Sequence, residues 1–338
     1  MWYKSDGAQK DVILSSRVRF ARNVDGYVFS TALTTDKATE LIERTKSVSK
    51  DFSFIDFSES DSLTAQSFAE KRIVSSNFAS ATAHRVLLQK NNTYIMLPEE
   101  DHIRLQVILP GFAVKQAYST AYDEISQLAE SLSFSFDPKL GYLTHCPTNL
   151  GTAMRAGAML FLPALTMFGK MNELIYSLPR MGFAIRGMYG EGSGGGACLY
   201  QISNQVTMGI SCEDTITKLE DILTHIVENE LELRHELHSK QYDSIRDMVL
   251  RSYGALKYAH SMTSDEFMKH YVNIRLGVSY NYQDLSHLSA HKIDQLMIEI
   301  MPHTLSISQN LFSPHVRDIA RAKVIREFMK GNPNYNDK

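Results

Sequence analysis

The sequence contains little cysteine, with only Cys146, Cys198 and Cys212 among 338 residues. An odd number of thiols cannot all pair with one another, and their spacing matches no paired metal-ligand motif. We therefore expect neither a disulfide framework nor a zinc site. Few, unpaired thiols are typical of a reducing compartment, which predicts a cytoplasmic protein.

Long apolar runs and an excess of positive charge are also missing. No run approaches the roughly 20 residues that a membrane-spanning helix needs, and residues 1–7 lack the apolar core of a signal peptide. The 35 Lys and Arg residues are outnumbered by 38 Asp and Glu residues, for a net charge of −3. A nucleic-acid-binding protein normally carries a clustered basic excess. We predict no membrane and no direct nucleic-acid partner.

The length of 338 residues predicts two domains, because single cores rarely grow beyond a few hundred residues. From residue 211 onward the apolar residues recur at spacings of three and four, which predicts a helix over about 214–240, with Glu230 as an exception. Further helices are expected from Thr263, over 290–299 and over 314–330. We place the domains at residues 1–245 and 246–338, the second one helical.

In the first domain, residues 11–22 begin as a β-type run. Arg17 and Arg19 are two residues apart, so on a strand both guanidinium groups point to one face, where paired forks suit phosphate oxygens. A solvated strand face is the ordinary alternative. Helices are predicted over 34–49 and 113–132, a hairpin over 86–97 and a strand over 105–110, whereas residues 50–65 look like a loop.

Residues 145–156 place a thiol, Cys146, beside the turn residues Pro147 and Gly151, a hydroxyl suited to capping a helix, and Arg155. The pattern predicts a turn into a helix. A cysteine near a helix N-terminus with an arginine close by favours the thiolate. A buried structural cysteine at such a turn is the alternative.

The loop 190–196 contains Gly-x-Gly-x-x-Gly at Gly190, Gly192 and Gly195. A strand is expected after it, over 198–203, whereas a dinucleotide-binding turn leads into a helix. We therefore expect a glycine-rich lid over a nucleotide and no dinucleotide fold.

Five segments in this order resemble the ATP:guanidino phosphotransferase family: residues 15–19, 99–104, 146–155, 186–191 and 201–204. The resemblance implies an α+β fold, in which an antiparallel β-sheet flanked by helices is followed by a C-terminal helical domain. It also implies transfer of the γ-phosphoryl group of ATP, with Mg²⁺, to a guanidinium nitrogen.

The same resemblance assigns the site residues. Glu100 is expected to be the base, Glu191 a second acid facing the guanidinium, and Cys146 a thiolate that stabilises the guanidinium charge. Arg72 stands where the family usually has histidine, Tyr189 where phosphagen kinases have a further arginine, and Gly194 where arginine kinase has a glutamate. The expected ATP contacts are Ser15, Ser16, Arg17, Val18, Arg19, Arg72, Arg104, Arg155, Ala156, Gly157, Ala158, Met159, Arg186, Gly187, Met188, Tyr189, Gly190 and Glu191.

The layout resembles the bacterial branch of the family that phosphorylates arginine side chains of proteins. Only fourteen residues precede Ser15, and the additional domain lies at the C-terminus, which leaves room for an arginine displayed on a protein. Family likeness suggests an activator protein, hand-over to a Clp-type unfoldase and a homo-oligomer. A kinase of free arginine and a weakly active phosphoarginine-binding adaptor are the alternatives.

In the second domain, Arg317, Asp318, Arg321 and Ala322 match a motif that resembles a phosphoarginine-binding module. On a helix Arg317 and Arg321 stand four residues apart on one face, with an acid beside them, so they are expected to form an allosteric phosphoarginine site. A salt-bridged surface helix is the alternative.

Overall fold

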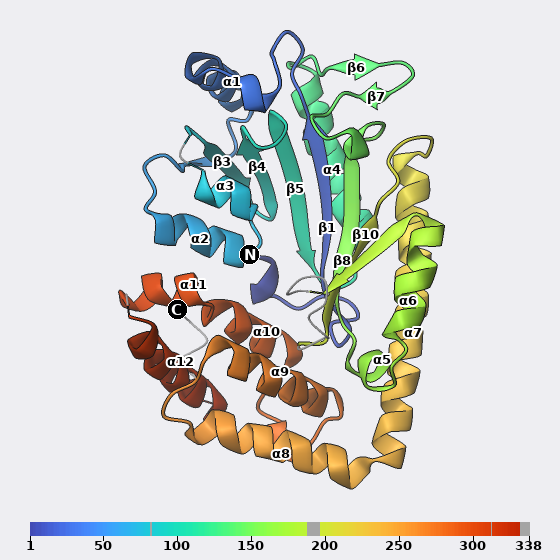
Figure 1. The fold of residues 1–338 in the computed structure, drawn as a ribbon, viewed down its shortest axis with the longest axis vertical. Helices are drawn as coiled ribbons and strands as arrows, with labels where there is room; N and C mark the ends of the chain where they lie inside the picture. The colour runs from blue at the N-terminus through green and yellow to red at the C-terminus, as the bar shows by residue number, and fades with distance from the viewer. Residues whose placement is uncertain (82, 188–196, 312, 332–338) are drawn as a thin grey trace.

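The computed structural model describes residues 1–81, 83–187, 197–311 and 313–331. Its centre is an antiparallel sheet (Figure 1). The strands, in spatial order, are β2 (Ser53–Asp56), β3 (Val86–Lys90), β4 (Thr93–Leu97), β5 (Ile103–Pro110), β1 (Ile13–Arg22), β8 (Met154–Phe161), β10 (Leu199–Asn204) and β9 (Phe183–Gly187). A separate small sheet pairs β6 (Phe136–Asp137) with β7 (Gly141–Tyr142).

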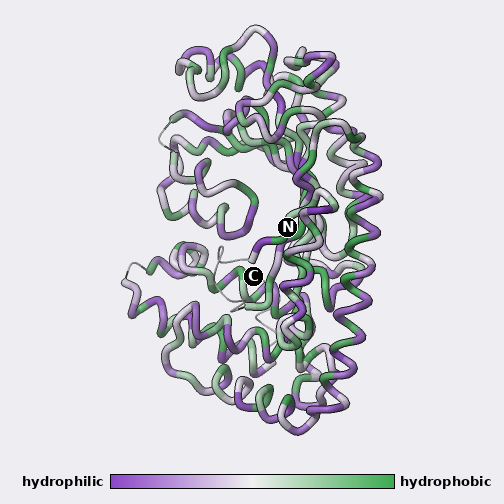
Figure 2. The backbone as a smooth tube through the Cα atoms, turned by 45° about the vertical axis from the view of Figure 1, so that its right-hand side comes forward, coloured by the Kyte–Doolittle hydropathy of each residue, from purple (hydrophilic) through white to green (hydrophobic). Residues whose placement is uncertain are grey.

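Two long helices, α4 (Val114–Ala129) and α7 (Cys212–Lys240), cover one face of the sheet. Helix α4 buries Ala117, Ala121, Ile125 and Leu128, whose spacing of three and four makes one apolar stripe. These side chains join Val18, Leu105 and Ala156 in one core, which we call the back core. In Figure 2, α7 runs along almost the whole length of the molecule.

The remaining helices of the first part lie around the sheet. Thr34 caps α1 by accepting a hydrogen bond from Lys37 N at 3.4 Å, as expected for a helix over 34–49. The α-helices here are α1 (Thr35–Val48), α2 (Ser62–Glu70), α3 (Ser76–Ser80), α5 (Pro163–Met167) and α6 (Met171–Ser177). Short 3₁₀ turns are η1 (Trp2–Lys4), η2 (Ser30–Ala32), η3 (Pro147–Asn149) and η4 (Leu178–Met181), and η5 (Gln283–Leu285) belongs to the C-terminal part.

The C-terminal part is helical and packs beneath the sheet in Figure 1. It consists of α8 (Tyr242–Tyr258), α9 (Ser264–Ser279), α10 (Ala290–Glu299), α11 (Pro302–Gln309) and α12 (Pro314–Met329). The predicted α+β class is confirmed, an antiparallel sheet flanked by helices with a C-terminal helical region. The division at residues 245 and 246 stays a prediction, and α8 runs through it.

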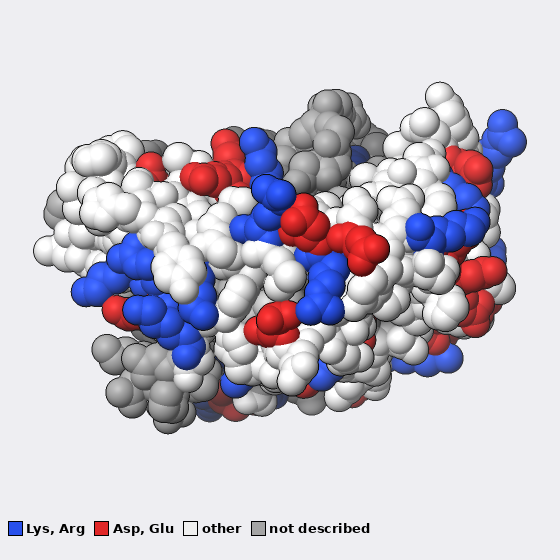
Figure 3. All heavy atoms as spheres, turned by 90° about the horizontal axis from the view of Figure 1, so that it is seen from below, with Lys and Arg blue, Asp and Glu red and all other residues white. Residues whose placement is uncertain are grey.

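Seen from below, a group of Lys and Arg side chains lies at the left of the visible face, and elsewhere on that face acidic and basic side chains lie side by side (Figure 3). Within the described ranges, no helix is long and apolar enough to cross a bilayer.

Two local predictions were wrong. Residues 50–65 contain β2 and the beginning of α2, which Asp61 caps through Thr64 N at 2.8 Å. Strand β2 escaped detection because it lies at the sheet edge, where Ser53 and Phe54 are exposed and give no apolar alternation.

The segment after Cys146 is the second error. It forms the short turn η3 and then strand β8, whereas a helix was expected. Strand β8 lies between β1 and β10 and is buried on both faces. A continuous apolar run of this kind fits a central strand as well as a buried helix, so periodicity alone could not decide.

Glu230, the exception in the apolar pattern of α7, is fully buried and has a structural role. Its carboxylate accepts hydrogen bonds from Ala164 N at 3.0 Å and Leu165 N at 2.9 Å, and pairs with Arg234 at 2.7 Å. Arg234 in turn donates to Phe161 O at 2.9 Å. The pair therefore joins α7 to the end of β8 and the beginning of α5.

We predict that Glu230→Ala lowers the free energy of unfolding by about 3–5 kcal/mol, because it leaves Arg234 buried without its partner. Urea denaturation measures this loss. The matched control is Glu232→Ala on the exposed side of the same helix, which should change stability by no more than about 0.5 kcal/mol. Equal losses in the two variants would contradict the assigned role of Glu230.

Candidate active site

The register of the strands places five arginines on one face of the sheet. Arg19 of β1 lies opposite Arg155 of β8, and Ala21 lies opposite Arg104 of β5. Gln201 of β10 connects Met159 of β8 to Arg186 of β9. Paired residues share a face and so do residues two apart along a strand. The face therefore carries Arg17, Arg19, Arg104, Arg155 and Arg186, and it lies opposite the back core.

Burial and mutual repulsion lower the pKa of several of these arginines. Burial, reinforced by repulsion from Arg72, Arg104 and Arg155, lowers the pKa of Arg17 to about 9. Burial and the neighbouring arginines also hold the pKa of Arg19 well below its usual value and lower that of Arg155. A polyanion bound here would remove the repulsion, so the face is suited to a chain of phosphates.

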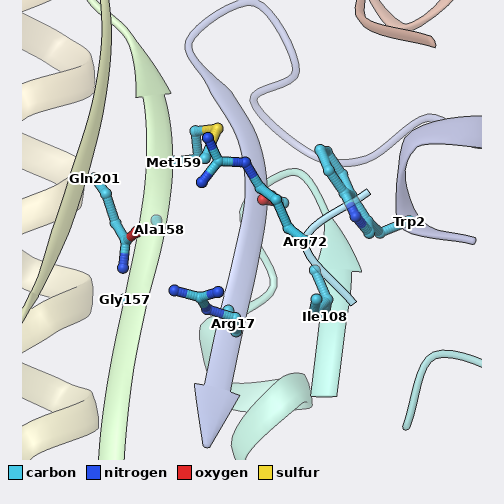
Figure 4. Close-up of a pocket in the computed structure, with 9 residues that line it drawn as sticks. Trp2, Arg17, Arg72, Ile108, Gly157, Ala158, Met159 and Gln201 are labelled. Atoms are coloured by element: carbon cyan, nitrogen blue, oxygen red, sulfur yellow. The ribbon is translucent and has the colours of Figure 1, made fainter. Parts of the chain in front are cut away.

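A first cavity, of about 290 Å³, opens where Arg17 and Arg72 reach into the same space (Figure 4). Its wall also contains Trp2, Ser15, Ile108, Gly157, Ala158, Met159 and Gln201. Gly157 is required for close packing, because a Cβ atom there would lie 2.3 Å from the carbonyl oxygen of Ile202. The cavity combines apolar walls with two guanidinium groups.

A second pocket, of about 510 Å³, lies next to the first along β1 and is more polar. Arg19, Arg104 and Arg155 line it together with three consecutive acids. Since Arg17 and Arg19 are neighbours on one strand face, a ligand with a base and a phosphate tail can extend from the first cavity into the second.

The three acids have different surroundings. Glu99 is buried, pairs with Arg104 at 2.5 Å and accepts a hydrogen bond from Ser75 Oγ at 2.6 Å. Asp101 accepts from Asn23 Nδ2 and from His145 N, both at 2.7 Å. Glu100 is exposed, and its carboxylate has no hydrogen bond or ion pair with any described residue. Of the three, Glu100 is the acid available to a substrate.

The loop of Cys146 is tied to this acidic segment through His145 N and Asp101. Cys146 Sγ lies 3.0 Å from Thr148 Oγ1. The thiol is also near enough to Arg155 that a thiolate there would favour the protonated arginine. The structure therefore brings Cys146, Arg155 and the acidic segment together.

Two positioning residues were missed from the sequence because their partners are distant in the chain. Asn23 donates to Asp101 and accepts from His102 N at 2.9 Å. Asn204 accepts from Ala156 N at 2.8 Å and donates to Met154 O at 3.1 Å, so it holds β8 on both sides of Arg155. Asparagine at a strand end carries no distinctive pattern.

His102 is a buried positioning residue as well. Its Nδ1 accepts from Val24 N at 3.0 Å and its Nε2 donates to Val28 O at 2.7 Å, an arrangement that needs the neutral ring. Burial lowers its pKa, in agreement with that form.

Not every expected ATP contact faces the pockets. Ser16, Val18 and Ala156 are fully buried on the side of the back core. Ser16 Oγ donates to Gly111 O at 2.8 Å. Arg186 and Gly187 lie at the exposed end of β9. Met188, Tyr189, Gly190 and Glu191, like the expected lid and Gly194, lie outside the described residues.

Comparison with known proteins identifies the class. Residues 34–233 match the catalytic domain family described as ATP:guanido phosphotransferase, C-terminal catalytic domain. The fold resembles the crystal structure of lombricine kinase, with a TM-score of 0.59 and 22% identity over 68% of this chain and 69% of that one. It also resembles a taurocyamine kinase from Schistosoma mansoni bound to transition-state-analogue components, with a TM-score of 0.60 and 23% identity over 67% and 34% of the two chains. The molecule is an ATP-dependent guanidino phosphotransferase.

Comparison of the C-terminal helices and of the whole chain identifies the branch of this class. Residues 242–338 match the protein-arginine kinase McsB C-terminal domain. A protein-arginine kinase of Caldanaerobacter subterraneus subsp. tengcongensis is 35% identical over 94% of this chain and 96% of its own length. One from Bacillus subtilis is 33% identical over 96% and 92%. The chain belongs to the protein-arginine kinase family.

A prediction on acid stability follows from Glu99. Burial raises its pKa, but Arg104 and the hydrogen bonds from Ser75 and Glu100 N outweigh this, and the net pKa is lowered. Because the pKa of Glu99 is lower in the folded state, its charge stabilises the protein above the unfolded-state pKa of about 4.3. This stabilisation is lost as the pH falls through the folded-state pKa. Glu99→Gln should therefore be less stable than wild type at pH 7, and the difference in free energy of unfolding should shrink below pH about 4.

Chemical denaturation between pH 7 and pH 3 measures this difference. Glu59→Gln, on an exposed position, is the control and should show no such trend. A difference that stays constant down to pH 3 would show that the Glu99 charge does not contribute to stability.

Proposed function

We propose that the chain transfers the γ-phosphoryl group of ATP to arginine side chains displayed on other proteins. One observation carries the proposal: a single pocket is lined by Arg19, Arg104 and Arg155 and also by Glu100, whose carboxylate has no partner among the described residues. Arginines that bind phosphates and an acid that faces an incoming guanidinium are the two requirements of this reaction.

In this proposal the nucleoside of ATP occupies the first cavity, with Arg17 and Arg72 near its inner phosphates. The γ-phosphate lies among Arg19, Arg104 and Arg155. Transfer of a phosphoryl group depends mainly on position and on neutralised charge, and the arginines supply both before the substrate arrives.

The acceptor guanidinium has a pKa above 12 and is not nucleophilic while protonated. Glu100 accepts a proton from the attacking nitrogen as that nitrogen bonds to the γ-phosphorus. The bond from phosphorus to the bridging oxygen breaks and ADP leaves with that electron pair. The Cys146 thiolate would stabilise the remaining guanidinium charge, and Glu191, outside the described residues, is proposed as a second acid.

Mg²⁺ belongs to the proposal as part of the nucleotide. In the described ranges no group of three His, Cys, Asp or Glu side chains gathers to hold a metal. This fits Mg²⁺, which usually keeps several water molecules and binds through substrate phosphates with few carboxylates. Bound with the nucleotide, the ion would supply additional charge neutralisation beside Arg19, Arg104 and Arg155, which line the phosphate pocket.

We predict that Glu100→Gln lowers the phosphorylation rate by about 10²–10⁴-fold, the usual contribution of a general base. The affinity for ATP should change little, because the carboxylate acts on the guanidinium. Initial rates and nucleotide titrations measure the two effects. Arg155→Ala is the contrasting variant and should impair nucleotide use. A loss of less than about tenfold in Glu100→Gln would exclude the base role.

The acceptor class needs its own test. ATP is incubated with either free arginine or an unfolded protein, and acid-labile phosphate is measured on each. We expect phosphate on the protein. Phosphate on free arginine alone would support the small-guanidine kinase, and none on either would support the phosphoarginine-binding adaptor.

By likeness to the family we further propose that phosphorylated proteins pass to a Clp-type unfoldase, that an activator protein assists, and that the chain forms a homo-oligomer. The three cysteines are free, which supports a location in the reducing cytoplasm.

We also propose that the motif of α12 binds phosphoarginine. Arg317 Nε is buried and has no hydrogen-bond partner among the described residues, so its N–H is a donor available to an anionic ligand. Arg321 is already engaged, because it is 1% exposed and donates to Ile300 O at 3.0 Å and Met262 O at 2.9 Å, and it also pairs with Asp318. Ala322, 1% exposed, packs in the core beside it. Arg321 therefore also holds the helices together.

Arg317→Ala should weaken phosphoarginine binding by about tenfold or more, since a charge-assisted hydrogen bond is lost. Calorimetric titration of full-length protein, with an ATP analogue blocking the active site, measures it. Lys323→Ala, exposed on the same helix, is the control. Equal affinities in wild type and Arg317→Ala would favour the salt-bridged surface helix. Arg321→Ala is unsuitable because its loss disturbs the fold.

A further inference from the structure

The turn of residues 70–73 connects the C-terminal helices to the first cavity. It follows α2, which lies directly above α11 in Figure 1. Its first residue, Glu70, contacts α11, and its third residue, Arg72, lines the cavity beside Arg17 (Figure 4).

Glu70 binds the N-terminus of α11 with both carboxylate oxygens. Oε1 accepts from His303 N at 2.9 Å and lies 2.8 Å from His303 Nδ1. Oε2 accepts from Thr304 N at 2.7 Å and Thr304 Oγ1 at 2.8 Å. The Glu70 side chain is 14% exposed. Four contacts on this largely buried carboxylate fix the end of α2 against α11.

The rest of the turn is held from the other side. Trp2 Nε1 donates to Lys71 O at 3.0 Å, and Gln106 Nε2 donates to Arg72 O at 3.3 Å and also to Ile73 O. Arg72 has φ of 62°, the left-handed region that arginine rarely adopts. A strained conformation of this kind persists only where the surroundings hold it, and such residues concentrate at functional sites.

We propose that Glu70 is a positioning residue for the nucleotide. By gripping α11 it fixes the left-handed turn that directs Arg72 into the first cavity, so the affinity for ATP depends on the C-terminal helices. The inference rests on the proposed contact of Arg72 with ATP. Glu70 is 233 positions from His303 in the sequence and does not line the cavity, so neither proximity in the chain nor contact with the cavity indicates its role.

The test is a double-mutant cycle on the full-length protein, with the dissociation constant of a non-hydrolysable ATP analogue and Mg²⁺ as readout. Glu70→Ala and Arg72→Ala should each weaken binding of the analogue by about tenfold. The double variant should bind as tightly as the single variant with the larger loss, because both changes disrupt the same contact. The KM for the protein substrate should stay within about twofold, because the acceptor pocket is untouched.

The control is Asp61→Ala, which removes the cap at the other end of α2 without touching α11. It should leave nucleotide affinity unchanged even where it lowers the melting temperature. Glu70→Gln keeps one accepting oxygen and should lose less affinity than Glu70→Ala. Should Glu70→Ala fold poorly, Thr304→Val removes one donor to Glu70 and should shift affinity in the same direction.

The inference would be overturned by unchanged affinity in Glu70→Ala, by losses that multiply fully in the double variant, or by an equal loss in Asp61→Ala. Unchanged affinity in Arg72→Ala would also overturn it, by removing Arg72 from the nucleotide contacts. Continued phosphorylation of protein arginine by that variant would leave the proposed function standing. Failure of every variant and of wild type to phosphorylate protein would instead defeat the proposed function.

Discussion

The arginines on one face of the sheet repel one another, and the rest of the structure must hold them together against this repulsion. Arg19 and Arg155 lie directly opposite each other on paired strands, an arrangement that normally destabilises a sheet. Their strands hold this position because the other face is a large apolar core against α4 and α7. The folded chain therefore presents a preorganised positive surface, which suits an anion such as the triphosphate of the proposed function.

The acids beside these arginines are divided by their surroundings. Glu99 neutralises Arg104 inside the fold, and Asp101 organises the backbone around Asn23 and His145. Glu100, between them, turns outward. The three acids lie in the bend between β4 and β5, where separate hydrogen-bond partners hold Glu99 and Asp101 and leave Glu100 exposed. Three identical-looking charges in the sequence therefore have three different roles in the fold.

Features that depend on the local spacing of residues can be predicted from the sequence. Features that depend on contact with a residue far away in the chain cannot. Alternation along β1 is enough to place Arg17 and Arg19 on one face, and the capping threonine is enough to begin α1. The meeting of Arg104 with Arg155 depends on the register of three strands, which no local pattern sets. Strand β8 was mistaken for the beginning of a helix because burial on both faces removes alternation. Four of the expected contacts lie outside the described residues and stay predictions.

The C-terminal helices are also tied to β1, at the point where the chain enters the sheet. Arg275 of α9, paired with Asp294 of α10, donates to Lys10 O at 2.6 Å. Arg234 of α7, the long helix on the face of the sheet, donates to the neighbouring Asp11 O at 3.0 Å. Both guanidinium groups are buried, and each also pairs with a carboxylate, Arg275 with Asp294 and Arg234 with Glu230. Residues 10 and 11 are thereby fixed just before the strand that carries Arg17 and Arg19. One core joins Trp2 and Met159 to the C-terminal helices. A shift of those helices would move the beginning of β1, and with it the arginines that we propose as phosphate ligands.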